Sequence, residues 1–562
     1  MSDERLSRAA RETLDARADL FAEATRNFPL PGGVITIADS SGVLAERAFG
    51  HADPGGGTPM DPSRRFEIGS ISKLFTSLVV NRLVDEGRLR LDETLAEVLP
   101  WVHLGPTSGS VTVERLLNHT SGLCVGADAL ADDAGEIVNS RRCVDAATAP
   151  VRFHYSNLGY LVLGEMVRAR SGRRLSDLVA EEWLAPLGMR HALARVTQTD
   201  RSSLAVGSWP LRPDRPWAPG DPLDAATFFE IDSASGNVAA RGTDMAALMT
   251  ALLAASRDDA VREAGEPVLS HGTFSRITSS LAPSGEPTYT VAGVDAVEDS
   301  RYGMGLNVER VGGHFCVSHG GGMVGYSTFM LVDCDAGVGV SVLTNANGDT
   351  LASHILARVV HADITRRLDG REPATGVTLE SRVTTLAGER IGLFASTPGG
   401  ETIDVRVEAD GVRVRARGHE GELFELANGR YVTTHPGLRR FHLDWSDGRW
   451  IYGEEIFAAT PVAPSPRAQP SENAGLAGHY RSFSPWFPEF RIIEREGRTL
   501  LVAPGGVEAP GEEVVLVELG DDEYRLGEDP WLPERLRVLA RRDGEVVSVE
   551  RDGCVYSRVF SA

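Results

Sequence analysis

The chain has 562 residues, of which 42% are hydrophobic and 24% charged, with a formal net charge of -22 and an isoelectric point near 5.1. This length exceeds what one hydrophobic core supports, so we expect two to four domains. The acidic balance leaves no basic excess to neutralise phosphates, which argues against a nucleic-acid partner and against an anionic membrane surface.

The N-terminal stretch Met1–Pro29 predicts a charged amphipathic helix without the apolar segment or cleavage pattern of a signal peptide. Since no run of about 18 apolar residues occurs, we expect no membrane span and a cytoplasmic location. The cysteines are odd in number and lack metal-ligand spacing, which favours reduced thiols, with no disulfide, metal or other cofactor. They are Cys124, Cys143, Cys316, Cys334 and Cys554.

The region up to about residue 372 predicts a domain of helices and strands. Two apolar runs within Gly32–Asp53, joined by Ser-Ser-Gly, are typical of a β-hairpin, and helical patterns dominate from residue 70 to about residue 255. Strands return over Tyr326–Asn345, followed by a helical pattern. Strands from both ends of the region predict one antiparallel sheet in an α/β (α+β) domain over residues 1–372.

Beyond residue 372 the period of the apolar residues changes to two. In Thr402–Gly418, apolar residues alternate with charged ones on both sides of Asp410-Gly411, which indicates a hairpin. We predict two β-barrel-like modules, over residues 373–463 and 476–562, joined by a Pro/Ser/Ala-rich linker over residues 464–475. Further turn signals begin at Asn428, Asp447, Glu496, Asp543 and Asp552.

The stretch FEIGSISKLFTSLVV, Phe66–Val80, places Ser70 and Lys73 three positions apart at the start of an apolar helical pattern. Residues at i and i+3 on a helix lie about 5–6 Å apart at Cβ, so the amine can reach the hydroxyl. A capping serine followed by a solvated lysine has the same spacing. The functional alternative is a serine nucleophile whose proton is taken by a desolvated lysine.

The stretch FHYSNLGYLVLGEMV places Tyr155 and Asn157 just before another helical pattern. A phenol can pass a proton to a leaving group, and a carboxamide can donate to a carbonyl while it orients a lysine. A helix N-cap asparagine is the structural alternative.

The stretch CVSHGGGMVGYSTFM places His319 and three glycines at the start of a strand. Glycines let a substrate lie against the strand, and the Gly322 N–H would join that of Ser70 in binding an oxyanion. A glycine bulge beside a satisfied histidine is the alternative. The oxyanion motif of α/β-hydrolases is rejected, because the chain has no G-x-S-x-G elbow and the glycines follow the serine.

In this order and at these intervals, S-x-x-K, Y-x-N and H-x-G resemble the three motifs of the penicillin-recognising serine hydrolase superfamily. The intervals look most like the branch of class C β-lactamases, D-aminopeptidases and esterases. Stretches such as VTVERLLNHTSGL and YGMGLNV also resemble that branch. The resemblance covers about residues 25–365 and implies a β-lactamase/transpeptidase-like catalytic domain with a helical subdomain.

The resemblance implies a catalytic role for three residues. Ser70 is the expected nucleophile, and Lys73 is the expected neutral amine that receives its proton or tunes Tyr155. Tyr155 is expected to protonate the leaving group and to activate the incoming nucleophile.

Further residues are expected around the substrate. Asn157 would hold the acyl side chain, and Gly322 would donate to the oxyanion together with the Ser70 N–H. His319 and Gly321 complete the substrate-binding motif. His119, in LLNHTSGL, is expected to be structural and to lie at a helix end.

Position 319 departs from the lysine of K-T-G that β-lactamases and transpeptidases of this superfamily carry. A largely neutral histidine is less suited to a substrate carboxylate, which weakens the case for β-lactam hydrolysis and for D-Ala-D-Ala carboxypeptidase activity. The two C-terminal modules resemble the D-aminopeptidase architecture, in which a barrel loop reaches the cleft. The acidic stretch Gly511–Glu513 is a candidate for such a loop, and two ordinary packing modules are the alternative.

We therefore expect a serine hydrolase that forms an acyl-enzyme on small peptide-like amides or esters, D-aminopeptidase-like or D-stereospecific in kind. A stand-alone acyltransferase, transacylase or peptide-cyclising thioesterase of natural-product biosynthesis is a second hypothesis, and a non-catalytic scaffold a third. The expected partner is a small peptide-like, ester or thioester substrate. The sequence does not indicate which oligomeric state the protein adopts.

Overall fold

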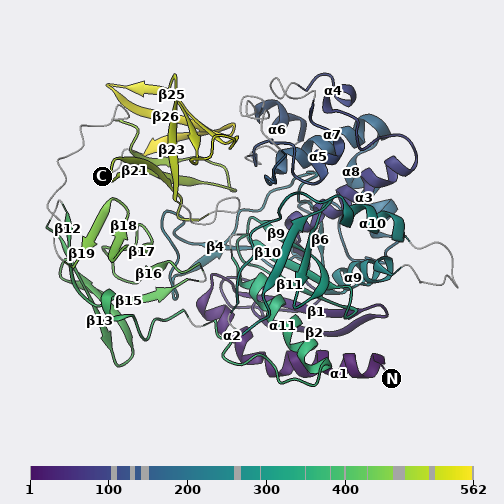
Figure 1. Cartoon of the computed structure of the whole chain (residues 1–562), viewed down its shortest axis with the longest axis horizontal. Coiled ribbons are helices and arrows are strands. Elements are labelled where there is room, and N and C mark those ends of the chain that lie inside the picture. The colour runs from purple at the N-terminus through teal and green to yellow at the C-terminus, as the bar shows by residue number, and fades with distance from the viewer. Residues whose placement is uncertain are drawn as a thin grey trace.

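A computed structural model describes residues 2–102, 110–126, 133–140, 151–257, 268–459, 475–505 and 513–559, apart from 292, 349, 380, 398, 399 and 427. Figure 1 shows one large body of helices and strands with two β-barrels beside it. Within these described ranges no helix is both long enough and apolar enough to cross a bilayer.

The large body is organised around a seven-stranded antiparallel sheet in the order β2-β1-β11-β10-β9-β8-β7. Strand β1 pairs with β11, with Gly33 opposite Thr344, so the two ends of the domain meet in one antiparallel sheet as predicted. Strands β1, β10 and β11 are buried along their whole length because helices cover both faces. The strands are β1 (Gly32–Asp39), β2 (Gly42–Gly50), β7 (Val297–Tyr302), β8 (Asn307–Val311), β9 (His314–Met323), β10 (Tyr326–Asp333) and β11 (Val338–Thr344).

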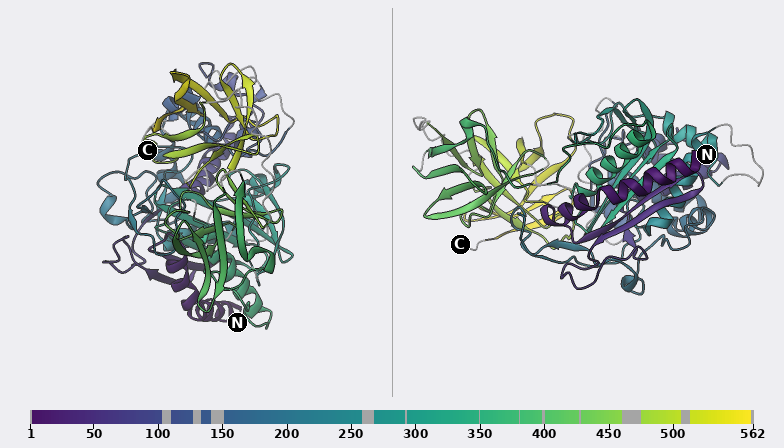
Figure 2. Two further views of the ribbon diagram at one scale, coloured as in Figure 1. Left: turned by 90° about the vertical axis from the view of Figure 1, so that its left-hand side faces the viewer. Right: turned by 90° about the horizontal axis from the view of Figure 1, so that it is seen from below.

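One face of the sheet packs against the two ends of the domain (Figure 2). The predicted single N-terminal helix is two helices, α1 (Ser2–Ala16) and α2 (Ala18–Asn27), separated by Arg17. Both lie with α11 (Ala352–Leu368), and the Arg17 guanidinium pairs with the buried Asp363 of α11 at 2.6 Å. The N-terminal segment is therefore part of the core.

The opposite face packs against the helical region. Its helices are α3 (Ser72–Asp85), α4 (Leu95–Val98), α5 (Val113–Leu117), α6 (Asp133–Ser140), α7 (Asn157–Ser171), α8 (Leu175–Val179), α9 (Gly242–Ser256) and α10 (His271–Ser279). Short helical turns lie at η1 (Gly69–Ile71), η4 (Ala180–Leu184) and η5 (Arg201–Ser203). Two small ribbons pair β3 (Phe66–Glu67) with β6 (Ala239–Ala240) and β4 (Ser208–Pro210) with β5 (Leu223–Ala225).

The C-terminal part forms two closed antiparallel barrels of eight strands each. The first follows the turn η6 (Gly388–Arg390) and comprises β12 (Gly392–Thr397), β13 (Thr402–Glu408), β14 (Gly411–Ala416), β15 (His419–Glu425), β16 (Tyr431–Thr433), β17 (Leu443–Ser446), β18 (Arg449–Tyr452) and β19 (Glu455–Ala458). The second comprises β20 (Gly478–Arg481), β21 (Glu489–Arg495), β22 (Arg498–Val502), β23 (Glu513–Gly520), β24 (Glu523–Leu526), β25 (Arg535–Arg542), β26 (Glu545–Arg551) and β27 (Cys554–Val559).

The predicted turns lie where the barrels need tight hairpins. Asp447, Glu496, Asp543 and Asp552 have positive φ angles and each precedes a glycine that also has a positive φ. That conformation matches the twist of a two-residue hairpin. The predicted linker lies almost entirely outside the described residues, and the predicted domain boundaries stay predictions.

Candidate active site

Ser70 lies in a tight turn rather than inside a helix. The turn η1 (Gly69–Ile71) directly precedes α3, whose N-cap is Ile71 without a side-chain cap bond, so Ser70 does not cap the helix. Gly69 has φ +53, and a Cβ there would lie 2.7 Å from the backbone N of Gly322. The glycine therefore permits strand β9 to approach the turn, and the half-buried Ser70 lies beside that strand.

Lys73 projects from the first turn of α3 into the site. Its side chain is completely buried, and its Nζ lies 2.9 Å from Ser70 Oγ. The same amine donates to Asn157 Oδ1 at 2.7 Å and to the backbone oxygen of Ser235 at 2.9 Å. All three oxygens belong to uncharged groups. The structure therefore places an amine and a hydroxyl in direct contact in a buried, low-dielectric setting. The solvated-lysine alternative is wrong.

Asn157 is the first residue of α7, and Ser156 is the N-cap. The Ser156 hydroxyl accepts the Gly159 N–H at 2.9 Å, which is the usual capping bond. The carboxamide of Asn157 is thereby available for Lys73, and the N-cap asparagine alternative is also wrong. Because Oδ1 accepts from Lys73, the amide orientation is fixed, and Nδ2 is its donor group.

Tyr155 stands between the lysine and a buried histidine. Lys73 Nζ lies 5.0 Å from the centroid of the Tyr155 ring, and the His119 ring lies 4.3 Å from it on centroids. His119 has φ +56 just after α5, and its Nδ1 accepts the Ser156 N–H at 3.1 Å. Burial and the Lys73 charge lower the pKa of His119 well below its ordinary value. His119 is structural, as expected, but the element that it orients is the loop carrying Tyr155.

The glycine run lies within β9 rather than at its start, and it lies against the Ser70 turn. A Cβ on Gly321 would fall 1.9 Å from the oxygen of Ile68, so only glycine fits there. Gly322 pairs with Ser327 of β10 and lies next to Gly69. The structure thus brings the backbone of Gly322 alongside the backbone of Ser70.

His319 lies behind this backbone. Its side chain is fully buried, its Nδ1 contacts the oxygen of Gly320 at 2.5 Å, and its Nε2 lies 2.7 Å from the hydroxyl of Tyr302. Since a carbonyl only accepts, Nδ1 carries the proton and Nε2 accepts from the phenol. Burial lowers the pKa of His319, and the Lys73 charge acts in the same direction. This ring is neutral and engaged within the protein, so its contact with substrate stays a prediction.

Sequence reasoning missed several groups near Ser70. Tyr302 lies in the quoted stretch YGMGLNV, but nothing in its spacing connects it to His319. Glu67, three residues before Ser70, has a pKa raised to about 8 by burial.

The acidic stretch Gly511–Glu513, predicted as a candidate barrel loop near the cleft, is described only at Glu513. Glu513 pairs with Arg495 and Arg430 at the barrels, and Gly511–Glu512 lie outside the described residues.

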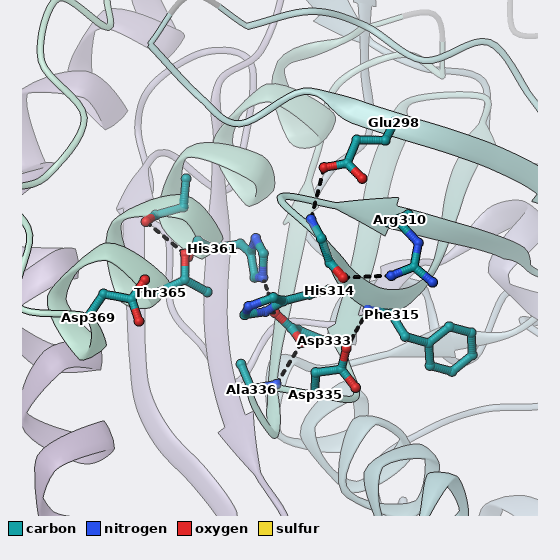
Figure 3. Close-up of polar contacts among 12 residues, drawn as sticks. Glu298, Arg310, His314, Phe315, Asp333, Asp335, Ala336, His361, Thr365 and Asp369 are labelled. Atoms are coloured by element: carbon teal, nitrogen blue, oxygen red, sulfur yellow. Dashed lines mark hydrogen bonds and ion pairs between the residues drawn. The ribbon is translucent and has the colours of Figure 1, made fainter.

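One group of possible metal ligands, Cys316, Asp333 and His361, occurs among the described residues, with ligand atoms within 4.8 Å of one another. In Figure 3, His314 and His361 both point toward the Asp333 carboxylate. They contact its Oδ2 at 2.7 and 2.8 Å, and the Ala336 N–H donates to Oδ1 at 2.8 Å. Burial would raise the pKa of Asp333, but these bonds, from His361 foremost, lower it. Protein donors thus satisfy the carboxylate.

A family model described as Beta-lactamase matches residues 18–364. The D-aminopeptidase of Cereibacter sphaeroides is 29% identical over 361 residues, which is 61% of this chain and 63% of that protein. The chain spans between 38% and 63% of the length of this and other curated relatives that it matches.

Two solved structures share the fold. The octameric penicillin-binding protein homologue from Pyrococcus abyssi has a TM-score of 0.52 and 22% identity, over 81% of this chain and 100% of that one. The D-amino acid amidase from Ochrobactrum anthropi SV3, solved with L-phenylalanine amide, has a TM-score of 0.50 and 20% identity, over 65% of this chain and 99% of that one. At these identities the likeness concerns the fold alone.

Proposed function

Because the chain belongs to the beta-lactamase family, whose fold is that of hydrolases, we propose that it is a serine hydrolase that forms an acyl-enzyme on Ser70. Its proposed substrates are small peptide-like amides or esters. The observation that carries the proposal is the buried Lys73 amine, which contacts both the Ser70 hydroxyl and the Asn157 carboxamide.

Acylation begins with proton transfer from Ser70 Oγ to Lys73 Nζ across the 2.9 Å contact. The oxygen attacks the substrate carbonyl carbon, and the carbonyl electron pair moves onto its oxygen. The N–H groups of Ser70 and Gly322 bind the negative charge that develops there. The close approach of Gly321 to Ile68 supports this pairing, because it fixes β9 against the Ser70 turn.

Departure of the amine or alcohol requires a proton. Tyr155 is the proposed donor, since its ring lies beside Lys73 and packs against the His119 ring at a tilt of 36°. In the second half of the cycle the Tyr155 phenolate left by that donation removes a proton from water, which attacks the acyl carbonyl. Lys73 returns its proton to Ser70 Oγ as the acyl group leaves. Asn157 is the proposed group that holds the acyl side chain of the substrate.

The proposed preference is for a D-configured residue with a free amine at the acyl side. The supporting relative is the D-aminopeptidase of Cereibacter sphaeroides. Neutral His319 adds support, because it supplies no cation for the carboxylate that a carboxypeptidase substrate carries.

A substrate panel tests the function. The purified protein is given D- and L-aminoacyl amides, esters and thioesters, with and without an added amine, and the products are separated by chromatography. Hydrolysis of D-aminoacyl amides or esters to the acid, lost in Ser70→Ala, is the expected result. Predominant formation of the new amide would instead identify a transacylase, and inertness toward every substrate would favour a scaffold.

A further inference from the structure

The loop between β24 and β25 of the second barrel, residues 527–534, lies against the catalytic loop. Glu534 is 8% exposed, and its Oε1 lies 2.6 Å from His154 Nε2 and accepts the Val125 N–H at 3.1 Å. His154 directly precedes Tyr155, and the oxygen of Val125 accepts the Asn157 N–H at 2.8 Å. One carboxylate therefore holds both segments that position the phenol and the carboxamide.

Aromatic groups cover this ion pair. The Trp531 ring meets the His154 ring edge-on at 5.6 Å, and the Arg152 guanidinium lies 5.3 Å from the Trp531 centroid. The paired side chains of His154 and Glu534 are only 14% and 10% exposed. Solvent screens the pair weakly, so loss of either partner leaves a poorly compensated charge.

The charges around the pair favour its ionised form. Burial would lower the pKa of His154, but the hydrogen bond and charge of Glu534, helped by Asp552, raise it. Burial would likewise raise the pKa of Glu534, but the bond from His154 lowers it. Asp552 has a pKa of about 6, raised by burial and opposed by the adjacent Arg551. The contacting Glu534 carboxylate, assisted by the charge of Asp552, therefore stabilises the imidazolium.

We propose that Glu534 is a positioning residue: paired with protonated His154, it holds Tyr155 and Asn157 in register with Lys73. This rests on the proposed function, because Tyr155 and Asn157 matter only if Ser70 is acylated. Displacement of a catalytic group by about 1 Å can cost about 100-fold in rate. The second barrel is thus part of the catalytic apparatus, although it contributes no reacting group.

The test compares Glu534→Gln with the wild type in the full-length chain. We expect kcat to fall by about 10- to 100-fold with KM changed less than about threefold, because the oxyanion groups of Ser70 and Gly322 stay in place and only the loop carrying Tyr155 and Asn157 shifts. The alkaline limb of the kcat profile should also move to lower pH, since His154 loses the carboxylate that raises its pKa. Glu528→Gln is the matched control, because Glu528 lies in the same loop, is exposed and pairs with Arg498.

Hydrogen exchange gives a readout that does not need activity. Backbone exchange over residues 152–158 should quicken in Glu534→Gln and stay unchanged in Glu528→Gln. Unaltered exchange there, or an unaltered kcat per fluorophosphonate-titrated site, would overturn the positioning role. A wild-type protein that no acylating probe labels would refute the proposed function, and the exchange result would then still decide whether Glu534 orders the loop.

A second and independent feature is an open cavity of about 710 Å³ between the two barrels. The first barrel lines it with Arg440 and Phe441, and the second with Arg491 and Ile493, which packs with Phe441. Arg491 is half-buried. The cavity is therefore lined by two guanidinium groups and by an apolar wall.

These two guanidinium groups differ from the other basic groups of the cavity. Arg417 pairs with Glu401 and Glu455, and Arg439 pairs with Asp221. In the part of the chain that the structure describes, neither Arg440 nor Arg491 has its guanidinium within ion-pair distance of a carboxylate. Burial and the charge of Arg440 lower the pKa of Arg491, while Glu489 and Asp214 oppose this. Two like charges thus converge without a contacting counter-ion in an acidic protein.

We infer that this cavity binds a small organic anion, with its carboxylate or phosphate on Arg440 and Arg491 and its apolar body against Phe441 and Ile493. Guanidinium forks match either oxyanion in a bidentate manner. Calorimetric titration of the full-length protein with benzoate and with phenyl phosphate at low salt should show binding by at least one, and the arm that binds identifies the head group.

The paired variant Arg440→Gln/Arg491→Gln should weaken that binding at least about tenfold, while Arg542→Gln, at a highly exposed site, should leave it unchanged. Binding of neither probe to the wild type, or equal binding to the folded double variant, would overturn the inference.

Discussion

The two barrels share an eight-stranded closed fold but meet the catalytic domain in different ways. The second contributes Trp486 to the core cluster that also contains the α3 and α7 side chains, and it contributes Glu534 to the catalytic loop. The first meets the domain through a small apolar cluster at Ala218 and through the pair between Asp221 and Arg439. The contrast indicates that strand pairing determines the barrel, whereas the loops between strands determine its role.

The largest expected effect on stability comes from replacing either of two buried tryptophans. Trp486, 5% exposed and 5.6 Å from Phe229 between ring centroids, joins the second barrel to the catalytic core. Trp450 is fully buried inside the first barrel. Replacement of either by alanine should lower the free energy of unfolding by about 3–5 kcal/mol, measured by denaturant titration.

Activity then distinguishes the two variants. Trp486→Ala should also reduce kcat per titrated active site, because the barrel that carries Glu534 loses its anchor. Trp450→Ala should leave kcat unchanged under conditions where it stays folded. Equal losses of kcat in both variants would erase the functional contrast between the barrels.

A smaller effect should appear with pH. The pKa of His154 is raised, so its pair with Glu534 stabilises the folded protein fully below the ordinary value of 6.5, and this stability is lost as pH rises through the raised folded pKa. The pKa of Glu534 is lowered, so its contribution is present above the ordinary 4.5 and is lost as pH falls through the lowered folded pKa. The free-energy difference between wild type and Glu534→Gln should therefore shrink as pH rises above about 6.5 and through the raised folded pKa of His154.

The first barrel should show no such loss, because the pair between Asp221 and Arg439 contains no histidine. A difference between wild type and Glu534→Gln that stays constant across this pH range would contradict the assignment of a charged His154.

The smallest effect belongs to the ion pair of the first barrel. Arg439 and Asp221 are 15% and 14% exposed at their side chains. Arg439→Gln should cost about 1 kcal/mol of stability, because Arg215, 3.4 Å from Asp221, still pairs with that carboxylate, and should leave kcat and KM unchanged. Thermal unfolding and steady-state kinetics measure the two quantities. A clear fall in kcat would show that the first barrel, too, supports the active site.

The predictable part of the site is the part that depends on short spacings. Ser70 and Lys73 are three positions apart, and Tyr155 directly adjoins the start of α7, so local geometry and the motif order were enough to bring them together. The sheet was predictable for a similar reason, because alternating runs at both ends of the domain needed partners.

The contacts that the sequence did not predict join distant segments. His154 and Glu534 are 380 positions apart, and neither belongs to a pattern with a recognisable period. The acidic stretch chosen at Gly511–Glu513 had the right charge, but charge alone does not say which barrel loop faces the catalytic domain. The contacts of His319 with Tyr302 and Gly320 also depend on the packed sheet, so the sequence could not predict them.

The most direct test of the account is intact-protein mass spectrometry after brief exposure to a D-aminoacyl ester or a fluorophosphonate. The account predicts a covalent mass increase in the wild type, none in Ser70→Ala, and formation about 100- to 10,000-fold slower in a folded Lys73→Ala variant. Acylation of Lys73→Ala at the wild-type rate would contradict the claim that the buried amine activates the serine.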